Sequence, residues 1–151
     1  MRYALDASFF FSGLVLDGEL VTPPSVTEEL ADLRSKGRLE ALLASGLSVV
    51  PPSAENLRRV TQAAGETGDA PRLSAADADL LALSLDLGAT VVTDDYAVQN
   101  VALRLGLGVR GILQRKAQPR HWKYRCPGCN RRYQAAGTCP DCGSALKRTL
   151  K

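Results

Sequence analysis

Four cysteines constrain the end of this chain more tightly than any other feature of its 151 residues. They form two C-x-x-C pairs, Cys126 with Cys129 and Cys139 with Cys142, with nine residues between the pairs. Two such pairs are typical of a tetrahedral thiolate site for zinc. Because all four ligands come from the protein, no position stays open for a reacting water. We therefore expect one structural zinc in a small ribbon at residues 122–151.

Two other uses of the cysteines have less support. Two disulfides would suit a secreted protein, but residues 1–5 carry one basic residue and lead directly into an aspartate, unlike a signal peptide. A redox C-x-x-C motif normally occurs singly beside a βαβ pattern. No apolar run approaches the roughly 18 residues that a membrane span needs. We therefore expect zinc rather than disulfides, no membrane partner and a cytoplasmic protein.

The formal net charge of +3 is the sum of two unlike parts. Residues 1–109 hold 8 Lys and Arg against 15 Asp and Glu, a net charge of −7. Residues 110–151 hold 11 Lys and Arg against one acid, a net charge of +10. This asymmetry predicts a polyanionic partner for the basic part. A solvated tail that only aids solubility is the alternative.

Short apolar segments alternate with helical patterns before the cysteines. Strands are predicted at residues 3–5, 20–22, 47–50, 89–92 and 107–112. An apolar turn is predicted at residues 9–16, and helices at 23–46, 53–67, 74–88 and 96–105. This alternation indicates an α/β domain with a parallel sheet flanked by helices. Such sheets place their functional sites at the carboxyl ends of the strands.

Acidic residues follow two of these strands directly. Asp6 comes after the first strand, and Asp94 and Asp95 come after the fourth. In a parallel sheet, the carboxyl ends of neighbouring strands lie at one edge. We therefore expect Asp6 to lie near one of the two later aspartates.

Helical-wheel positions select two further carboxylates. Glu29 lies at the border of the apolar face of its helix, formed by residues 26, 30 and 33, whereas Glu28 points toward solvent. Asp77 lies inside the leucine-rich face of the helix at residues 74–88. A carboxylate in that place must be neutralised, hydrogen-bonded or bound to a cation. A capping box with Ser74 explains Asp77 equally well when it is taken by itself.

The four positions form one predicted group: Asp6, Glu29, Asp77, and Asp94 or Asp95. Divalent cations would relieve the repulsion between these carboxylates, and hard oxygen ligands suit Mg²⁺ or Mn²⁺. Sites of this kind hydrolyse phosphodiesters, because one ion activates water and a second can stabilise the leaving oxygen. Residues 1–113 contain no histidine or cysteine that competes as a nucleophilic centre.

The acidic residues lie in motifs that resemble those of PIN-domain nucleases. The motifs are LDAS at 5–8, VTEEL at 26–30, LSAAD at 73–77 and TDD at 93–95. The longer segment TDDYAVQNVA at 93–102, together with WKYRC at 122–126 and the cysteine pairs, is more specific. It resembles the archaeal and eukaryotic endonucleases that mature the 3′ end of small-subunit rRNA.

This resemblance implies a PIN-like nuclease domain at residues 1–113, a linker at 114–121 and the ribbon at 122–151. It implies catalysis by Asp6, Glu29, Asp77 and Asp95, with Asp94 as a substitute or an addition. Asp6, Asp77 and Asp95 would bind Mg²⁺ or Mn²⁺, and Glu29 would bind through water or orient the attacking water. The implied substrate is precursor rRNA in the preribosomal small subunit.

The basic part supplies the candidate RNA contacts. They are Arg115, Lys116, Arg120, Lys123, Arg125, Arg131 and Arg132. Three aromatic residues, Trp122, Tyr124 and Tyr133, are expected either to stack on bases or to pack the small ribbon core. The single histidine, His121, is expected to be a surface residue.

Two other functions stay open on the sequence. One is a toxin-type PIN ribonuclease that a protein partner neutralises, which the attached ribbon argues against. The other is a non-catalytic RNA-binding assembly factor, which the retained acids argue against. The sequence selects no oligomeric state.

Overall fold

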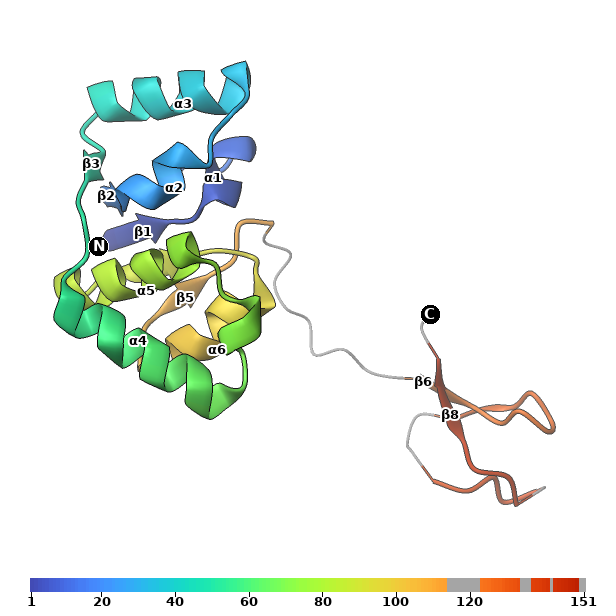
Figure 1. Cartoon of the computed structure of the whole chain (residues 1–151). Helices are drawn as coiled ribbons and strands as arrows, with labels where there is room; N and C mark the ends of the chain where they lie inside the picture. Colours follow the sequence, from blue (N-terminus) through green and yellow to red (C-terminus); the bar gives the residue numbers. More distant parts are fainter. Residues whose placement is uncertain (114–122, 134–136, 142, 150–151) are drawn as a thin grey trace. The chain divides into compact units, whose positions relative to one another are not determined.

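The computed structural model of the chain describes residues 1–113, 123–133, 137–141 and 143–149 (Figure 1). The chain divides into two compact units, Met1–Leu113 and Gln114–Lys151. No helix among the described residues is long and apolar enough to cross a membrane. The expected linker at residues 114–121 lies outside the described residues.

The first unit is built on a five-stranded parallel sheet with the order β3-β2-β1-β4-β5. The strands are β1 (Arg2–Leu5), β2 (Glu19–Thr22), β3 (Ser48–Val49), β4 (Thr90–Val92) and β5 (Val109–Arg110). All five predicted strands are present, although β3 and β5 are shorter than their apolar segments suggested. The predicted α/β fold with a parallel sheet is confirmed.

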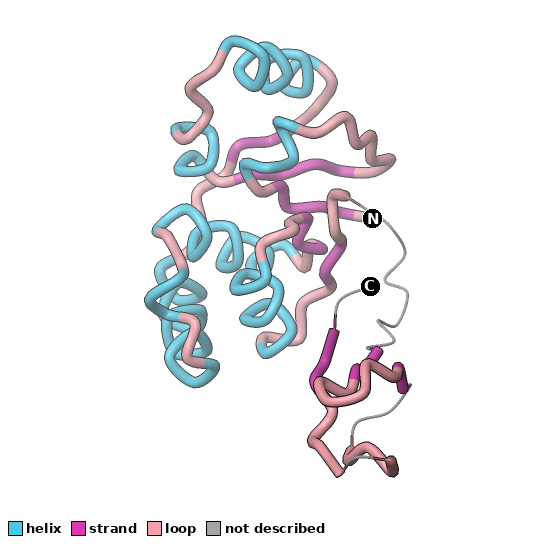
Figure 2. Tube along the Cα trace, turned by 90° about the vertical axis from the view of Figure 1, so that its right-hand side faces the viewer, coloured by secondary structure: helices cyan, strands magenta, loops and turns pink. Residues whose placement is uncertain are grey.

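Six α-helices accompany this sheet (Figure 2). They are α1 (Ala7–Phe11), α2 (Pro24–Glu28), α3 (Leu33–Ala44), α4 (Ala54–Thr67), α5 (Ala75–Leu87) and α6 (Tyr96–Arg104), with a short 3₁₀ helix η1 (Ala70–Arg72). In Figure 1, α1, α2 and α3 lie above β1, and α4 and α6 lie below it. The alternation of side chains along β1 matches this division. Tyr3 and Leu5 join the core formed with α1, α2 and α3, whereas Ala4 joins the core formed with α4, α5 and α6.

Two local predictions were wrong. Residues 9–16 were expected to form a turn, but Ala7–Phe11 forms α1, with Asp6 as its N-cap. The helix expected at 23–46 is two helices, because Asp32 accepts a hydrogen bond from the Ser35 amide at 3.0 Å and caps the start of α3. Leu33 begins that second helix and is 92% exposed, so it does not belong to the apolar face of α2.

The second unit is a three-stranded antiparallel sheet with the order β7-β6-β8. Its strands are β6 (Lys123–Arg125), β7 (Arg132–Tyr133) and β8 (Lys147–Thr149). Tyr124 lies opposite Tyr133, and Arg125 lies opposite both Arg132 and Lys147.

Candidate functional site

Asp6 is held at the carboxyl edge of the parallel sheet. Its amide donates to the Val92 carbonyl at 3.2 Å, so the ends of β1 and β4 lie side by side. One carboxylate oxygen, Oδ1, accepts from the Ala7 amide at 2.7 Å and caps α1. The other, Oδ2, accepts from the hydroxyls of Thr93 at 2.7 Å and Ser8 at 3.3 Å. These contacts fix the orientation of the carboxylate.

Thr93 links two of the acidic residues. Its side chain is fully buried, and the hydroxyl that donates to Asp6 also accepts from the Asp95 amide at 3.1 Å. Gln99 donates from its side chain to the Thr93 carbonyl at 2.8 Å. Sequence analysis did not name Thr93 as a site residue, although the threonine that opens the TDD motif was the available signal. The structure gives it the role of positioning Asp6 and the loop of Asp95.

The adjacent aspartates have different surroundings. Asp94 accepts hydrogen bonds from the amides of Ile112 at 2.7 Å and Leu113 at 3.1 Å. A Cβ at Gly111 would lie 3.2 Å from Asp94 Oδ1, so a glycine there suits the close approach of this loop. Asp95 caps α6 by accepting from the Ala97 amide at 2.9 Å. Asp94 therefore anchors the last residues of the first unit, Ile112 and Leu113, to the loop that follows β4.

Asp77 is both a helix-capping residue and a partly buried carboxylate of the acidic group, the two roles that the sequence left open. It forms a capping box, in which the Ser74 amide donates to Asp77 Oδ2 at 3.0 Å and the Asp77 amide donates to Ser74 Oγ at 3.1 Å. Burial raises the pKa of Asp77, and the negative charges of Asp6 and Asp95 raise it further against the lowering effect of the Ser74 hydrogen bonds. The cap therefore holds a half-buried carboxylate within electrostatic reach of Asp6 and Asp95.

Glu29, at the end of α2, is the fourth member of the acidic group with Asp6, Asp77 and Asp95. Partial burial raises its pKa, and the charges of Asp77 and Asp6 add to this increase. Ser25 donates to Asp79 Oδ2 at 2.6 Å and so ties α2 to α5, the helix that carries Asp77. Val26 and Leu30 are both buried, as predicted for one face of this helix, but Glu29 is exposed like Glu28, so burial does not distinguish the two glutamates.

Four elements thus present carboxylates that influence one another: α1, α2, α5 and α6. Among the described residues, no three of these carboxylates have oxygens that all lie within 4.8 Å of one another; only cysteines meet that spacing. A wider spacing fits Mg²⁺, which usually keeps several waters, so that one or two carboxylates would bind it directly and the others through water. The hard oxygen donors and their mutual repulsion therefore fit a hydrated divalent cation.

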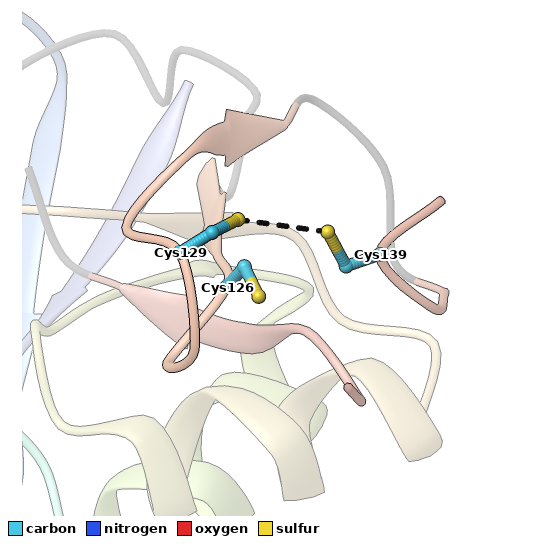
Figure 3. Close-up of side chains that lie close together, drawn as sticks. All are labelled: Cys126, Cys129 and Cys139. Atoms are coloured by element: carbon cyan, nitrogen blue, oxygen red, sulfur yellow. Dashed lines mark hydrogen bonds between the residues drawn. The ribbon is translucent and has the colours of Figure 1, made fainter. Parts of the chain in front are cut away.

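Three cysteines of the second unit form a compact cluster (Figure 3). The sulfur atoms of Cys126, Cys129 and Cys139 all lie within 4.8 Å of one another, and Cys129 and Cys139 are 3.7 Å apart. A disulfide requires about 2.05 Å, whereas two thiolates on one tetrahedral zinc, each about 2.3 Å from the metal, lie about 3.8 Å apart. The cluster therefore fits zinc and not a disulfide. Cys142 lies outside the described residues.

The residue after each C-x-x-C pair shapes the turn. Asn130 has φ +63°, and Gly143 has φ +71°, both in the left-handed region. The Asn130 amide donates to the Cys126 carbonyl and the Gly143 amide to the Cys139 carbonyl, each at 2.9 Å. The two pairs therefore form turns of the same kind, as two halves of one metal site require.

The two faces of the ribbon sheet carry different side chains. Arg132, Arg125 and Lys147 are exposed and lie directly opposite one another across three strands, so like charges are neighbours on one face. Successive strand residues point to opposite faces. The other face carries Tyr133, whose hydroxyl lies 3.3 Å from Cys139 Sγ, and its cross-strand partner Tyr124. We call the row of three cations the cationic row; Lys147 was not among the predicted contacts.

The remaining candidate RNA contacts differ in what the structure says of them. Arg131 forms an ion pair with Asp141, so its charge already has a partner. Lys123 belongs to β6 through its backbone. The other candidates lie outside the described residues: Arg115, Lys116, Arg120 and Trp122. His121, which was expected to be a surface residue, lies outside them as well.

Comparison with known proteins identifies the fold of the first unit. A family model described as the PIN domain of ribonuclease matches residues 4–87, a span that contains Asp6, Glu29 and Asp77. The chain belongs to the PIN-domain family of ribonucleases. The prediction of an endoribonuclease with a PIN domain is therefore confirmed.

Relatives match the chain along nearly its whole length. Endoribonuclease Nob1 of Pyrococcus abyssi is 44% identical over 151 residues, which cover 97% of this chain and 92% of that protein. Endoribonuclease Nob1 of Methanothermobacter thermautotrophicus is 39% identical and covers 98% and 92%. Ribonuclease VapC1 of Thermoplasma acidophilum is 38% identical and covers 98% of this chain and 78% of that protein. The similarity thus extends through the cysteine-containing unit as well as the PIN domain.

Proposed function

We propose that this PIN-domain protein is a metal-dependent endoribonuclease that cleaves precursor rRNA at the 3′ end of the small-subunit RNA. The observation that carries the proposal is the group of four carboxylates: Thr93 joins Asp6 to the loop of Asp95 at the carboxyl edge of the sheet, and charges of this group raise the pKa of Asp77 and of Glu29 beyond the effect of burial. The TDDYAVQNVA and WKYRC motifs support the rRNA substrate. So does the 44% identity to endoribonuclease Nob1 along both proteins.

Each acidic residue has a proposed part in the chemistry. Asp6, Asp77 and Asp95 would hold Mg²⁺ or Mn²⁺, which would supply the positive charge that activates water and stabilises the leaving oxygen. Thr93 keeps the carboxylate of Asp6 in its orientation. Glu29, whose pKa is raised by burial and by its acidic neighbours, orients the attacking water and accepts its proton.

The second unit has the proposed part of holding the RNA. Zinc on Cys126, Cys129, Cys139 and Cys142 organises the ribbon. The cationic row then presents positive charge to the phosphates of a single strand. A precursor rRNA substrate implies work on the preribosomal small subunit in the cytoplasm.

Cleavage mapping tests the substrate assignment. An RNA that spans the mature 3′ end of the protein's own small-subunit rRNA is incubated with the full chain and Mn²⁺, beside an RNA of equal length and composition in shuffled order. We expect one main cut at the mature end, and none in the shuffled RNA. Equal cutting of both RNAs would contradict the assignment and favour the toxin-type activity. Tight binding of the precursor without cleavage would favour the assembly factor.

A further inference from the structure

Tyr96 is an exposed aromatic residue at the catalytic edge that the proposed chemistry does not use. It is 72% exposed, although the next two residues of α6, Ala97 and Val98, are buried. None of the described residues forms a hydrogen bond or ring contact with its side chain. It directly follows Asp95, so the Cα atoms of these two residues are about 3.8 Å apart.

The position of Tyr96 on its helix directs it toward the acids. Side chains on an α-helix lean toward the helix N-terminus and cover the turn before their own Cα. Tyr96 is the first residue of α6, so there is no earlier helical turn for it to cover. The lean expected of its side chain is therefore toward the loop of Asp94 and Asp95 at the carboxyl edge of the sheet.

The charge of this edge limits how RNA can be held there. Residues 1–109 carry a net charge of −7, and the edge itself concentrates carboxylates. The net charge of this part of the chain therefore does not favour the binding of phosphates. Stacking of a base on an aromatic ring needs no positive charge and tolerates any base sequence. An exposed ring beside the acids supplies that contact.

We propose that Tyr96 is a stacking platform that holds the base of a nucleotide next to the scissile phosphate. The inference rests on the proposed ribonuclease function and adds a substrate-binding residue to it. Stacking acts on bound RNA before and during cleavage alike, so its loss raises KM and leaves kcat nearly unchanged. Alanine substitution of a stacking residue weakens binding by about fivefold to 150-fold.

The chain offers a matched control on the same helix. Leu103 is 65% exposed and lies seven residues after Tyr96, two turns or about 10 Å farther along nearly the same side of α6. With a short single-stranded RNA and the full chain, we expect Tyr96→Ala to raise KM about fivefold or more. Tyr96→Phe, which keeps the ring, and Leu103→Ala should leave KM within about twofold of the wild type.

Abasic RNAs identify the stacked base. The base is removed at one position at a time near the cut, and the affinity of each RNA is measured by fluorescence anisotropy without added Mn²⁺, where the structural zinc stays bound and no cleavage is needed. One abasic position should weaken binding to the wild type as much as Tyr96→Ala does, and the two changes together should cost no more than either alone. Losses that add at every abasic position would overturn the proposal. So would equal KM and equal affinity for the wild type and Tyr96→Ala, a result that would favour a protein rather than RNA as the partner of Tyr96.

The two readouts separate this inference from the proposed function. A wild-type protein that binds RNA through Tyr96 but cuts none would contradict the nuclease proposal and retain the platform. If the wild type cuts RNA and Tyr96→Ala changes neither KM nor affinity, the nuclease proposal is supported and the stacking platform is contradicted.

Discussion

Asp94 and Asp95 show how neighbouring residues of one type take different tasks. Asp94 accepts from the amides of Ile112 and Leu113 and fastens the end of the first unit. Asp95 caps α6, and its charge reaches Asp77. Because the charge of Asp95 helps to raise the pKa of Asp77, whereas the carboxylate of Asp94 is occupied by two backbone amides, we assign the proposed metal-binding role to Asp95.

This assignment predicts a clear difference between two single substitutions. Asp95→Asn should lower the rate of RNA cleavage about 100-fold or more, because loss of a metal ligand removes several kcal/mol of transition-state stabilisation. Its fold should persist, since asparagine also caps helices well. Asp94→Asn should retain most of the rate. Single-turnover cleavage and circular dichroism check both variants, and an equal loss of rate in the two would contradict the assignment.

The raised pKa values of Glu29 and Asp77 predict how pH affects metal binding. Without metal, burial and then repulsion by neighbouring carboxylates disfavour the charged forms of Glu29 and Asp77, so their contribution to stability improves as pH falls through the raised pKa values. Metal binding needs the charged forms and weakens over the same range. Saturating Mn²⁺, at about 100 times its Kd, should therefore stabilise the protein by about 2.7 kcal/mol near neutral pH.

Thermal unfolding with and without Mn²⁺ measures this effect. The increase in Tm caused by Mn²⁺ should be larger at about pH 7.5 than at about pH 5. Glu29→Gln should reduce the increase, whereas Glu28→Gln should not, because the charges that raise the pKa of Glu29 and Asp77 come from other acids of the group. An increase that is the same at both pH values, or equally reduced in both variants, would count against metal binding by this group.

At the scale of helices and strands, much of the site could be predicted from the sequence. Asp6 and the aspartate pair follow buried strands, and Asp77 lies on an uninterrupted helix, so position along each element was enough to select them. The break between α2 and α3 could not be predicted from apolar spacing. It depends on the cap that Asp32 forms with Ser35, which competes with continued helix. The TDD motif could have indicated the local bond between the Asp95 amide and the Thr93 hydroxyl, but the bond from Thr93 to Asp6 joins the ends of two strands, which no local pattern encodes.

The next prediction concerns how much the ribbon strands depend on bound zinc. We expect one zinc per chain, because the sulfur spacing fits a single tetrahedral ion. Cys126→Ser removes a buried ligand, and structural zinc contributes about 10–16 kcal/mol to small domains. This variant should lose zinc and hydrogen-exchange protection in β6, β7 and β8 while β1 and β4 stay protected. Full protection of the ribbon strands in zinc-free protein would contradict a structural metal.

The cationic row predicts how salt affects RNA binding. Replacing Arg125, Arg132 and Lys147 with alanine removes three phosphate contacts, so the slope of log K against log salt should become shallower by about 2. Arg131→Ala is the control, because Arg131 is already paired with Asp141. Affinities of one single-stranded RNA at several salt concentrations give both slopes. An unchanged slope in the triple variant would place the RNA contacts elsewhere.

For the whole molecule, the difference in net charge between residues 1–109 and residues 110–151 corresponds to two different proposed tasks. The acidic first unit contains the carboxylates that a cation would neutralise, and the basic second unit contains exposed cations on one face of a small sheet. Neither unit has both properties. RNA affinity and cleavage should therefore respond to different substitutions, and the net charge of +3 predicts neither.

The most direct measurement is RNA cleavage by the full chain with Mn²⁺, with Mn²⁺ and excess EDTA, and by Asp77→Asn with Mn²⁺. Asparagine can keep the hydrogen bond from the Ser74 amide, so the variant should fold normally. We predict cleavage in the first case only, with the rate of the variant lowered about 100-fold or more. Undiminished cleavage by folded Asp77→Asn protein, or in excess EDTA, would contradict a metal-dependent site built from these four acids.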